Sequence, residues 1–240
     1  MRCILSFLLF FAVFPVYSQV ISSNEIDKNE RDEVVGLFGT ILAPSIFSSA
    51  KAEKLSFSVY GRSITGEGEV PDFDGDVKEK IDSLQVFINA RMGGLGATVG
   101  FGQGNEFEFS QPLIVSVDYK LTIPELLPII DAAIDAQYSM IYLPKEKIIK
   151  VSAPGFGTAS INGIVSANLL FILEPYAGVT FNYVYLDSED EFIKIWKTVP
   201  KLGLKLKILP VVNIGTELSF VDNKYINSSW IWNIGATARF

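Results

Sequence analysis

Three lysines near the C-terminus, Lys201, Lys205 and Lys207, have a spacing that could create a site for anions. Side chains two residues apart in an extended strand point to the same face, so all three would lie on one side of a strand. Along a water-filled passage, such a row of ammonium groups would favour anions. In a narrow interior the same lysines would pair with carboxylates, because an unpaired buried charge is costly. The sequence favours pairing and leaves the anion path open.

A second candidate site is the acidic stretch that contains Asp72, Asp74 and Asp76. Carboxylates at this spacing could bind a divalent cation. The stretch departs from the EF-hand pattern, because Val77 stands where that loop requires glycine. A solvated acidic surface loop is the simpler interpretation, and no metal or other cofactor is predicted.

The chain of 240 residues contains no histidine. Proton transfer and nucleophile activation near neutral pH most often depend on an imidazole, so the sequence predicts that the chain is not an enzyme. The formal net charge of −7 also argues against nucleic acid as a partner.

The first 18 residues are predicted to be a secretory signal peptide. Arg2 precedes an apolar stretch at 4–16, and Val16 and Ser18 stand three and one residues before a cut at Gln19. The stretch is shorter than the roughly 20 residues that a membrane-spanning helix needs. Removal of residues 1–18 would change the formal net charge to −8 and would remove the chain's one cysteine, Cys3.

Residues 19–52 are predicted to form an N-terminal helical segment. A polar, acid-rich start is followed by apolar residues at helical spacing, and Pro44 ends the pattern. These apolar residues are Val34, Leu37, Phe38, Ile41 and Leu42. The helix could plug the lumen of a barrel, close its periplasmic mouth or lie outside.

Residues 53–240 alternate between apolar and polar side chains, which predicts a series of β-strands. Ten strands are expected at about 54–64, 82–92, 95–102, 113–121, 131–143, 159–172, 177–185, 201–208, 212–220 and 230–240. The fifth also suits a helix. Short connections at 93–94, 173–175 and 209–210, with a longer one at 123–130, alternate with long ones at 65–81, 103–111, 144–158, 187–199 and 222–228. This asymmetry is typical of transmembrane β-barrels.

The same alternation assigns a set of charged side chains to the polar faces of the strands. In a barrel with an apolar outer wall these faces would line the lumen. The candidates are Arg62, Arg91, Asp118, Lys120, Asp135, Lys201, Lys205, Lys207, Glu217 and Arg239. A shift of one residue in any strand would reverse its assignment.

The last strand carries Trp230, Trp232 and Phe240 on its apolar face. This ending resembles the C-terminal strand of bacterial outer-membrane β-barrels, whose terminal phenylalanine and alternating residues are read by the insertion machinery. The resemblance implies an all-β, transmembrane antiparallel barrel of about ten strands with a short N-terminal helical segment. It also implies that the chain is located in the bacterial outer membrane, with membrane lipid and the barrel assembly machinery as partners.

Three classes of function remain open from the sequence. The first is a small passive pore or a surface-exposed structural protein. The second is an adhesin or interaction protein that acts through the acidic outer loops at 65–81 and 187–199. The third is a soluble secreted, lipocalin-like binding barrel whose apolar faces point inward. The known enzymes among outer-membrane barrels resemble one another in relying on a histidine, which this chain lacks. No motif identifies a solute or an external partner.

Overall fold

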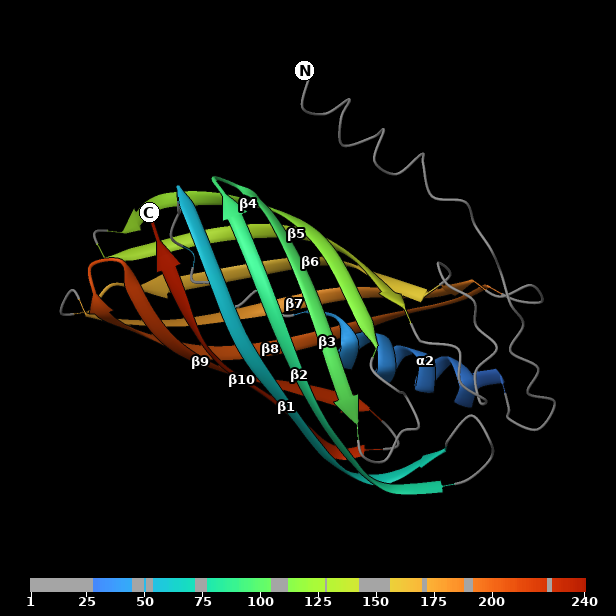
Figure 1. Cartoon of the computed structure of the whole chain (residues 1–240). Coiled ribbons are helices and arrows are strands. Elements are labelled where there is room, and N and C mark those ends of the chain that lie inside the picture. The colour runs from blue at the N-terminus through green and yellow to red at the C-terminus, as the bar shows by residue number, and fades with distance from the viewer. Residues whose placement is uncertain are drawn as a thin grey trace.

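In a computed structural model of the chain, ten antiparallel strands close into a single barrel (Figure 1). Each strand pairs with its neighbours in sequence, and β1 pairs with β10 to complete the wall. The predicted antiparallel barrel of ten strands with one short helix is confirmed. The elements are α2 (Lys28–Leu42), β1 (Leu55–Pro71), β2 (Val77–Met92), β3 (Leu95–Gly104), β4 (Leu113–Leu127), β5 (Ile130–Tyr142), β6 (Phe156–Ala167), β7 (Leu173–Asp187), β8 (Phe192–Leu209), β9 (Val212–Asn223) and β10 (Ile226–Arg239).

The structure describes residues 28–44, 50, 54–71, 77–104, 112–127, 129–142, 156–169, 172–187, 192–223 and 226–240. The predicted signal peptide at 1–18 and the acidic candidate site at 72–76 lie outside these residues. In the described part of the chain, no helix is both long and apolar enough to cross a membrane.

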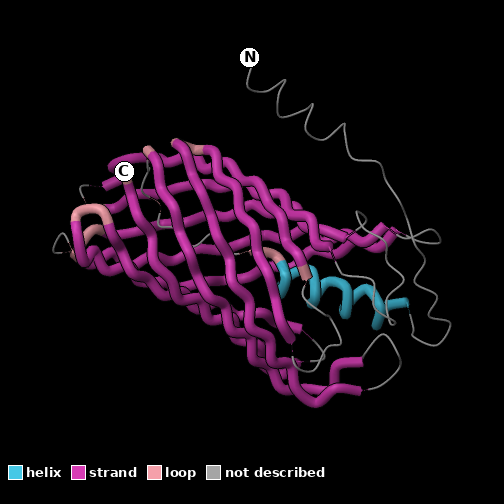
Figure 2. The backbone as a smooth tube through the Cα atoms, in the orientation of Figure 1, coloured by secondary structure: helices cyan, strands magenta, loops and turns pink. Residues whose placement is uncertain are grey.

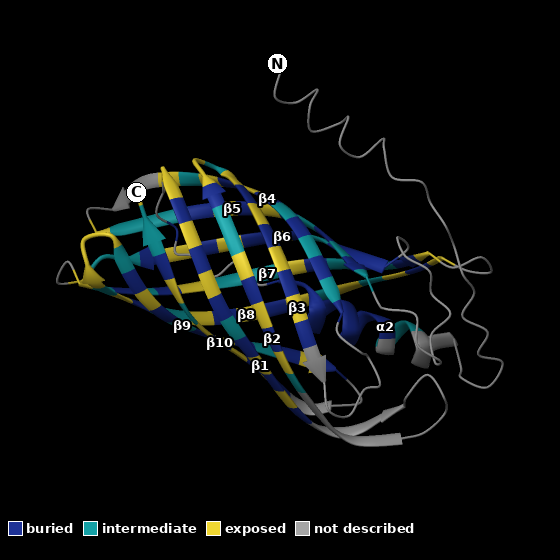
Figure 3. Cartoon of the chain, viewed as in Figure 1, coloured by how far each residue is buried: buried dark blue, intermediate teal, exposed yellow. Residues whose placement is uncertain are grey.

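The wall of the barrel is apolar on the outside and largely polar on the inside. Leu202 and Leu206 of β8 are exposed, whereas Lys201 and Lys205 on the same strand are buried. The same alternation produces the bands of exposed and buried residues along the strands in Figure 3. It follows from the two-residue period of a strand, and it reverses the usual arrangement of soluble proteins, in which lysine is almost never fully buried.

The two ends of the barrel differ. At one end, here called the turn end, β2 and β3 are joined by Gly93 and Gly94, and β8 and β9 by residues 210–211. Gly93 has a φ of 61°, a conformation that a tight turn requires and that glycine adopts without strain. Phe240 also lies at the turn end, where its N–H donates to the carbonyl of Leu55. At the opposite end, here called the loop end, β1 ends at Pro71 and β2 begins at Val77 (Figure 1).

At the loop end, strands extend into segments that the sequence assigned to loops. β1 and β2 continue to a pair between Pro71 and Val77 within the predicted loop 65–81. β8 begins at Phe192, within the predicted loop 187–199. The prediction failed here because the loops were assigned from polar composition, whereas the ladder bonds join main-chain groups whatever the side chains are.

At the turn end, two predicted connections are also partly strand. β7 begins at Leu173, where a turn was expected at 173–175. β4 continues to Leu127, through a register shift that follows Ile123. Pro124 accounts for the shift, because proline has no N–H to donate to the ladder.

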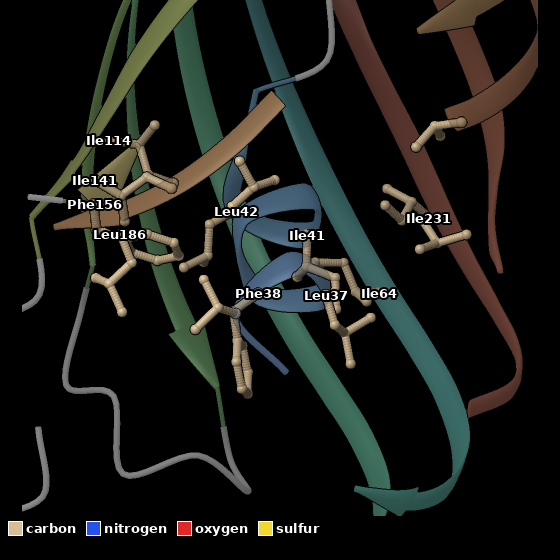
Figure 4. Close-up of a cluster of buried hydrophobic side chains, with 14 of the residues drawn as sticks. Leu37, Phe38, Ile41, Leu42, Ile64, Ile114, Ile141, Phe156, Leu186 and Ile231 are labelled. Atoms are coloured by element: carbon tan, nitrogen blue, oxygen red, sulfur yellow. The ribbon is translucent and has the colours of Figure 1, made fainter. Parts of the chain in front are cut away.

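The helix α2 enters the barrel at the loop end: its C-terminal part is enclosed by the wall, and its N-terminal part extends toward the loop-end mouth (Figure 2). Its buried residues Val35, Leu37, Phe38, Ile41 and Leu42 belong to one cluster with apolar side chains of the inner wall (Figure 4). The predicted helix is therefore confirmed, and of the three positions left open by the sequence, the structure shows the one inside the lumen.

Candidate functional site

The ten charged residues predicted from strand parity all belong to the inner face of the wall. Eight of them are buried: Arg62, Arg91, Asp118, Lys120, Asp135, Lys201, Lys205 and Glu217. Lys207 and Arg239 are of intermediate exposure. Because these charged side chains line the interior of the barrel, the lumen is the candidate functional site.

One cluster joins β2, β4 and β5 through Arg91, whose side chain spans β3, the strand that lies between β2 and β4. Its Nη2 contacts a carboxylate oxygen of Asp118 and lies 3.2 Å from Oδ2 of Asp135. Its Nη1 also donates to the carbonyl of Gly94, at 3.0 Å. The three charged side chains are at most 2% exposed, so the guanidinium lies between two carboxylates that are shielded from water. The buried Lys120, which stands opposite Asp135 in the β4–β5 register, supplies the second positive charge of this cluster.

The three lysines of β8, Lys201, Lys205 and Lys207, face carboxylates. Nζ of Lys201 lies 3.9 Å from Oε2 of Glu217, and Nζ of Lys207 lies 3.6 Å from Oε2 of Glu174. Lys205 stands directly across from Glu174 in the register of β7 and β8. The three lysines thus lie within a network of mixed charges. An anion that entered the lumen would not meet a row of free ammonium groups.

Glu217 is the central acceptor of this network. Tyr176 donates to its Oε2 at 3.1 Å, and Asn233 donates to its Oε1 at 3.1 Å. Glu217 is fully buried, so these neutral donors and Lys201 together replace the water that its charge would otherwise need.

The sequence interpretation missed Glu174 because it was assigned to a turn. The alternation could have assigned Glu174 to the inner face, because an extension of β7 by a few residues places it on the same face as Tyr176, Gly178 and Thr180. Further charges of the lumen were also missed, among them Asp131 at the start of β5. Lys197 lay in a predicted loop, and Glu33 lay in the polar start of the helix.

Arg62 connects the helix to both sides of the β1–β10 pairing. Its Nη1 donates to the carbonyls of Ile41, at 3.0 Å, and Ala43, at 2.6 Å. Its Nε donates to Oδ1 of Asn233 on β10, at 2.9 Å. The guanidinium also lies 4.8 Å from the ring centroid of Phe87. A positive charge at the C-terminal end of a helix compensates carbonyls that have no partner within the helix.

The other end of α2 is held by Glu33. Nζ of Lys197 donates to Oε2 of Glu33 at 2.6 Å, and the amide of Asn223 donates to the same oxygen and to the Glu33 carbonyl, both at 3.3 Å. Between these anchors, a Cβ added at Gly36 would lie 2.6 Å from Ile195. Glycine at this position lets the helix backbone approach the wall closely.

The chain that follows the helix also lies in the lumen at residue 50. Ala50 is fully buried in a cluster with Ala133, Ile164 and Tyr176, which belong to β5, β6 and β7. This cluster lies nearer the turn end than Arg62 does, because Tyr176 is close to the start of β7.

Beside the end of the helix, a cavity of about 30 Å³ remains between Pro44, Arg62 and Lys201. It has room for one or two water molecules. Within the described residues, no group of three or more Cys, Asp or Glu side chains could hold a metal ion. The lumen is thus occupied by the helix, by paired charges and by apolar side chains.

No family model matches the chain, and no curated protein matches it in sequence. Solved structures resemble it in fold. An outer membrane channel from Pseudomonas putida F1 is 8% identical with a TM-score of 0.49, and the match covers 83% of this chain and 100% of that one. The beta domain of the Bordetella autotransporter BrkA is 11% identical with a TM-score of 0.47, over 79% and 100% of the two chains. Neisserial surface protein A is 14% identical with a TM-score of 0.34, over 79% and 99%.

Proposed function

We propose that the chain is an integral barrel of the bacterial outer membrane that is exported by its signal peptide at 1–18. The apolar exterior supports this proposal, because Leu84, Val86 and Ile88 project from one strand with exposed fractions of 61%, 45% and 51%. The strands have 10 to 18 residues, and a transmembrane β-strand needs about 9–11. A closed barrel also leaves no unpaired strand edge, as the hydrocarbon region requires.

The orientation follows from the two ends of the wall. Outer-membrane barrels have short turns on the periplasmic side and longer loops outside. The turn end, with Gly93, residues 210–211 and Phe240, would therefore face the periplasm, and the loop end would face the outside of the cell. The hairpin of β1 and β2 would then project from the cell surface (Figure 1).

The function that the geometry supports best is that of a closed, surface-exposed structural barrel, rather than a standing pore. The observation that carries this choice is the docking of α2 in the lumen by Arg62, which is 1% exposed. An open pore would require water where Leu37, Phe38 and Ile41 now pack. The network around Glu217 and the Arg91 cluster provide further support, because charges that pair with one another do not select solutes. That the chain is not an enzyme stays a prediction.

If the barrel is closed, the protein is expected to conduct no ions across a membrane. Purified wild-type protein, inserted into a planar lipid bilayer, is expected to give no steady single-channel conductance, because the helix and the paired charges fill the lumen. Migration of the same sample before and after boiling would verify that it is folded, since an intact barrel shifts on heating. A uniform, long-lived conductance step from the folded protein would contradict the proposal and favour the passive pore.

We also propose that Trp230, Trp232 and Phe240 form the assembly signal. All three side chains are exposed on the outer wall, and Phe240 lies 6.4 Å from Phe57, ring centroid to ring centroid. We expect Phe240→Ser to reduce the amount of folded barrel in the membrane several-fold, because the insertion machinery would read the terminus less well.

The folded fraction of the Phe240→Ser variant should unfold much like the wild type, because Phe240 makes few contacts and is 70% exposed. Met92→Ser is the matched control, since Met92 is 71% exposed at the same end and is not part of the signal. The measurement is the heat-shifted band in membrane fractions. Equal insertion of the Phe240→Ser variant and the wild type would contradict the signal.

A further inference from the structure

The geometry points to a threaded N-terminus: the mature chain passes lengthwise through its own barrel, so that the residues before Lys28 emerge at the loop end. With the orientation proposed above, on which this inference rests, the N-terminus would be at the cell surface while the C-terminus faces the periplasm. The barrel would then present its own N-terminal segment outside the cell.

The first step of the path is near the loop end. Glu33 contacts Lys197 and Asn223. Asn223 is the last residue of β9, the strand that begins at the turn end with Val212. Lys197 is a few residues from the start of β8 at Phe192, which is also a loop-end position. The first turns of α2 are therefore held at the loop end.

The second step is in the middle of the barrel. The carbonyls of Ile41 and Ala43 accept from Arg62, which is paired in the wall with Asn233 and Gln85. All three wall residues lie well inside their strands. Between Glu33 and Ala43, the chain has therefore moved from the loop end to the centre.

The third step completes the passage. Ala50 is buried against Tyr176, near the start of β7. The carbonyl of Lys54 then accepts from the N–H of Gly93 in the β2–β3 turn, and β1 begins at Leu55. Residues 33, 43, 50 and 54 thus contact the wall at successively deeper levels, which makes the direction of the chain unambiguous.

A return of the N-terminus through the lumen to the turn end is opposed by the length of the segment and by the packing around the helix. Only nine residues, 19–27, precede Lys28 after the predicted signal peptide, and they reach about 32 Å when fully extended. About 22 Å of this length would be needed to pass the 15-residue helix alone. Tyr60, Phe87 and Ile114 of the wall are buried in one cluster with the helix, and a returning segment would have to displace these contacts.

Single cysteines can test the threading, because the chain has one cysteine, Cys3, which Cys3→Ser removes. The probe variant is Ser23→Cys. Asp222→Cys is the control for the loop end, and Val211→Cys is the control for the turn end; both native side chains are exposed. Intact cells would be treated with a membrane-impermeant maleimide, and each variant would also be labelled after the outer membrane is permeabilised.

We expect Ser23→Cys to be labelled on intact cells as strongly as Asp222→Cys, and Val211→Cys to be labelled only after permeabilisation. If Ser23→Cys follows Val211→Cys, the threading is overturned. If Val211→Cys is labelled on intact cells and Asp222→Cys is not, the proposed orientation fails; the threading is then judged by which control Ser23→Cys follows. The heat shift of each variant verifies that its barrel is folded.

Discussion

Replacement of Arg91 by methionine is expected to destabilise the folded barrel by about 3–5 kcal/mol, the usual cost of removing one partner from a buried ion pair. Asp118 and Asp135 would be left in the lumen with their main counter-ion gone, and both carboxylates are almost fully shielded from water. The measurement is the free energy of unfolding by denaturant in detergent micelles, followed by tryptophan fluorescence.

A variant that removes the charges together provides the control. Arg91→Met combined with Asp118→Asn leaves Asp135 opposite the buried Lys120, so the remaining charges balance, and this double variant is expected to recover most of the lost stability. If the single and double variants are equally destabilised, the shape of Arg91 matters and its charge does not. A single variant within about 1 kcal/mol of the wild type would contradict the prediction outright.

Replacement of Arg62 by methionine is expected to release the N-terminal segment from the lumen while the wall stays folded. Arg62 donates hydrogen bonds to the carbonyls of Ile41 and Ala43, and hydrogen bonds that involve a charged group are worth about 1.5–3 kcal/mol each. A loss of about 3 kcal/mol would raise the undocked population about 100-fold, at 1.4 kcal/mol for each factor of ten.

The undocked state can be measured with a thiol placed in the buried interface. In the Cys3→Ser background, Leu42→Cys should react with maleimide about 100-fold faster when Arg62→Met is also present, because Leu42 is 5% exposed in the docked state. Ser63→Met is the matched control, since Ser63 is the next residue and faces outward. An unchanged labelling rate would mean that Arg62 does not hold the helix.

Strand parity was the part of the fold that the sequence could determine. A side chain in a strand has two possible faces, so one clear alternation fixes every residue of that strand. The alternation assigned Arg62, Asp118 and Glu217, from three separate strands, to the inner face, and all three side chains are buried in the structure. The fifth strand shows the limit of the pattern, since residues around Ala133 fit a helix equally well and only pairing with both neighbours decides the matter.

The partners of the inward charges could not be predicted, because they depend on the register between strands. Glu174 meets Lys205 across the β7–β8 ladder, and the two residues are 31 positions apart in the chain. Nothing in the local sequence around Lys205 reports this neighbour. From the sequence alone, an anion path along the lysines therefore stayed possible. The strand register places carboxylates beside these lysines, which argues against such a path.

The position of the helix also could not be predicted from the sequence. The apolar spacing from Leu37 to Leu42 predicts a buried face and does not say what covers it. The cover is the inner wall itself, where Gly39 lies so close to Val184 that an added Cβ would overlap that side chain. A glycine in a helix is unfavourable on propensity alone, and its reason emerges only from this contact.

The junction between β1 and β10 has a consequence for the order in which the molecule assembles. It joins Ser56 to Arg239, which are 183 positions apart, and Arg62 bridges it through Asn233 while the same guanidinium binds the helix. Contacts between such distant residues form late, because the whole intervening chain must first be ordered. A wall that closed before the N-terminal segment had entered would leave that segment outside, so we expect enclosure of the segment and sealing of the membrane wall to be a single kinetic step.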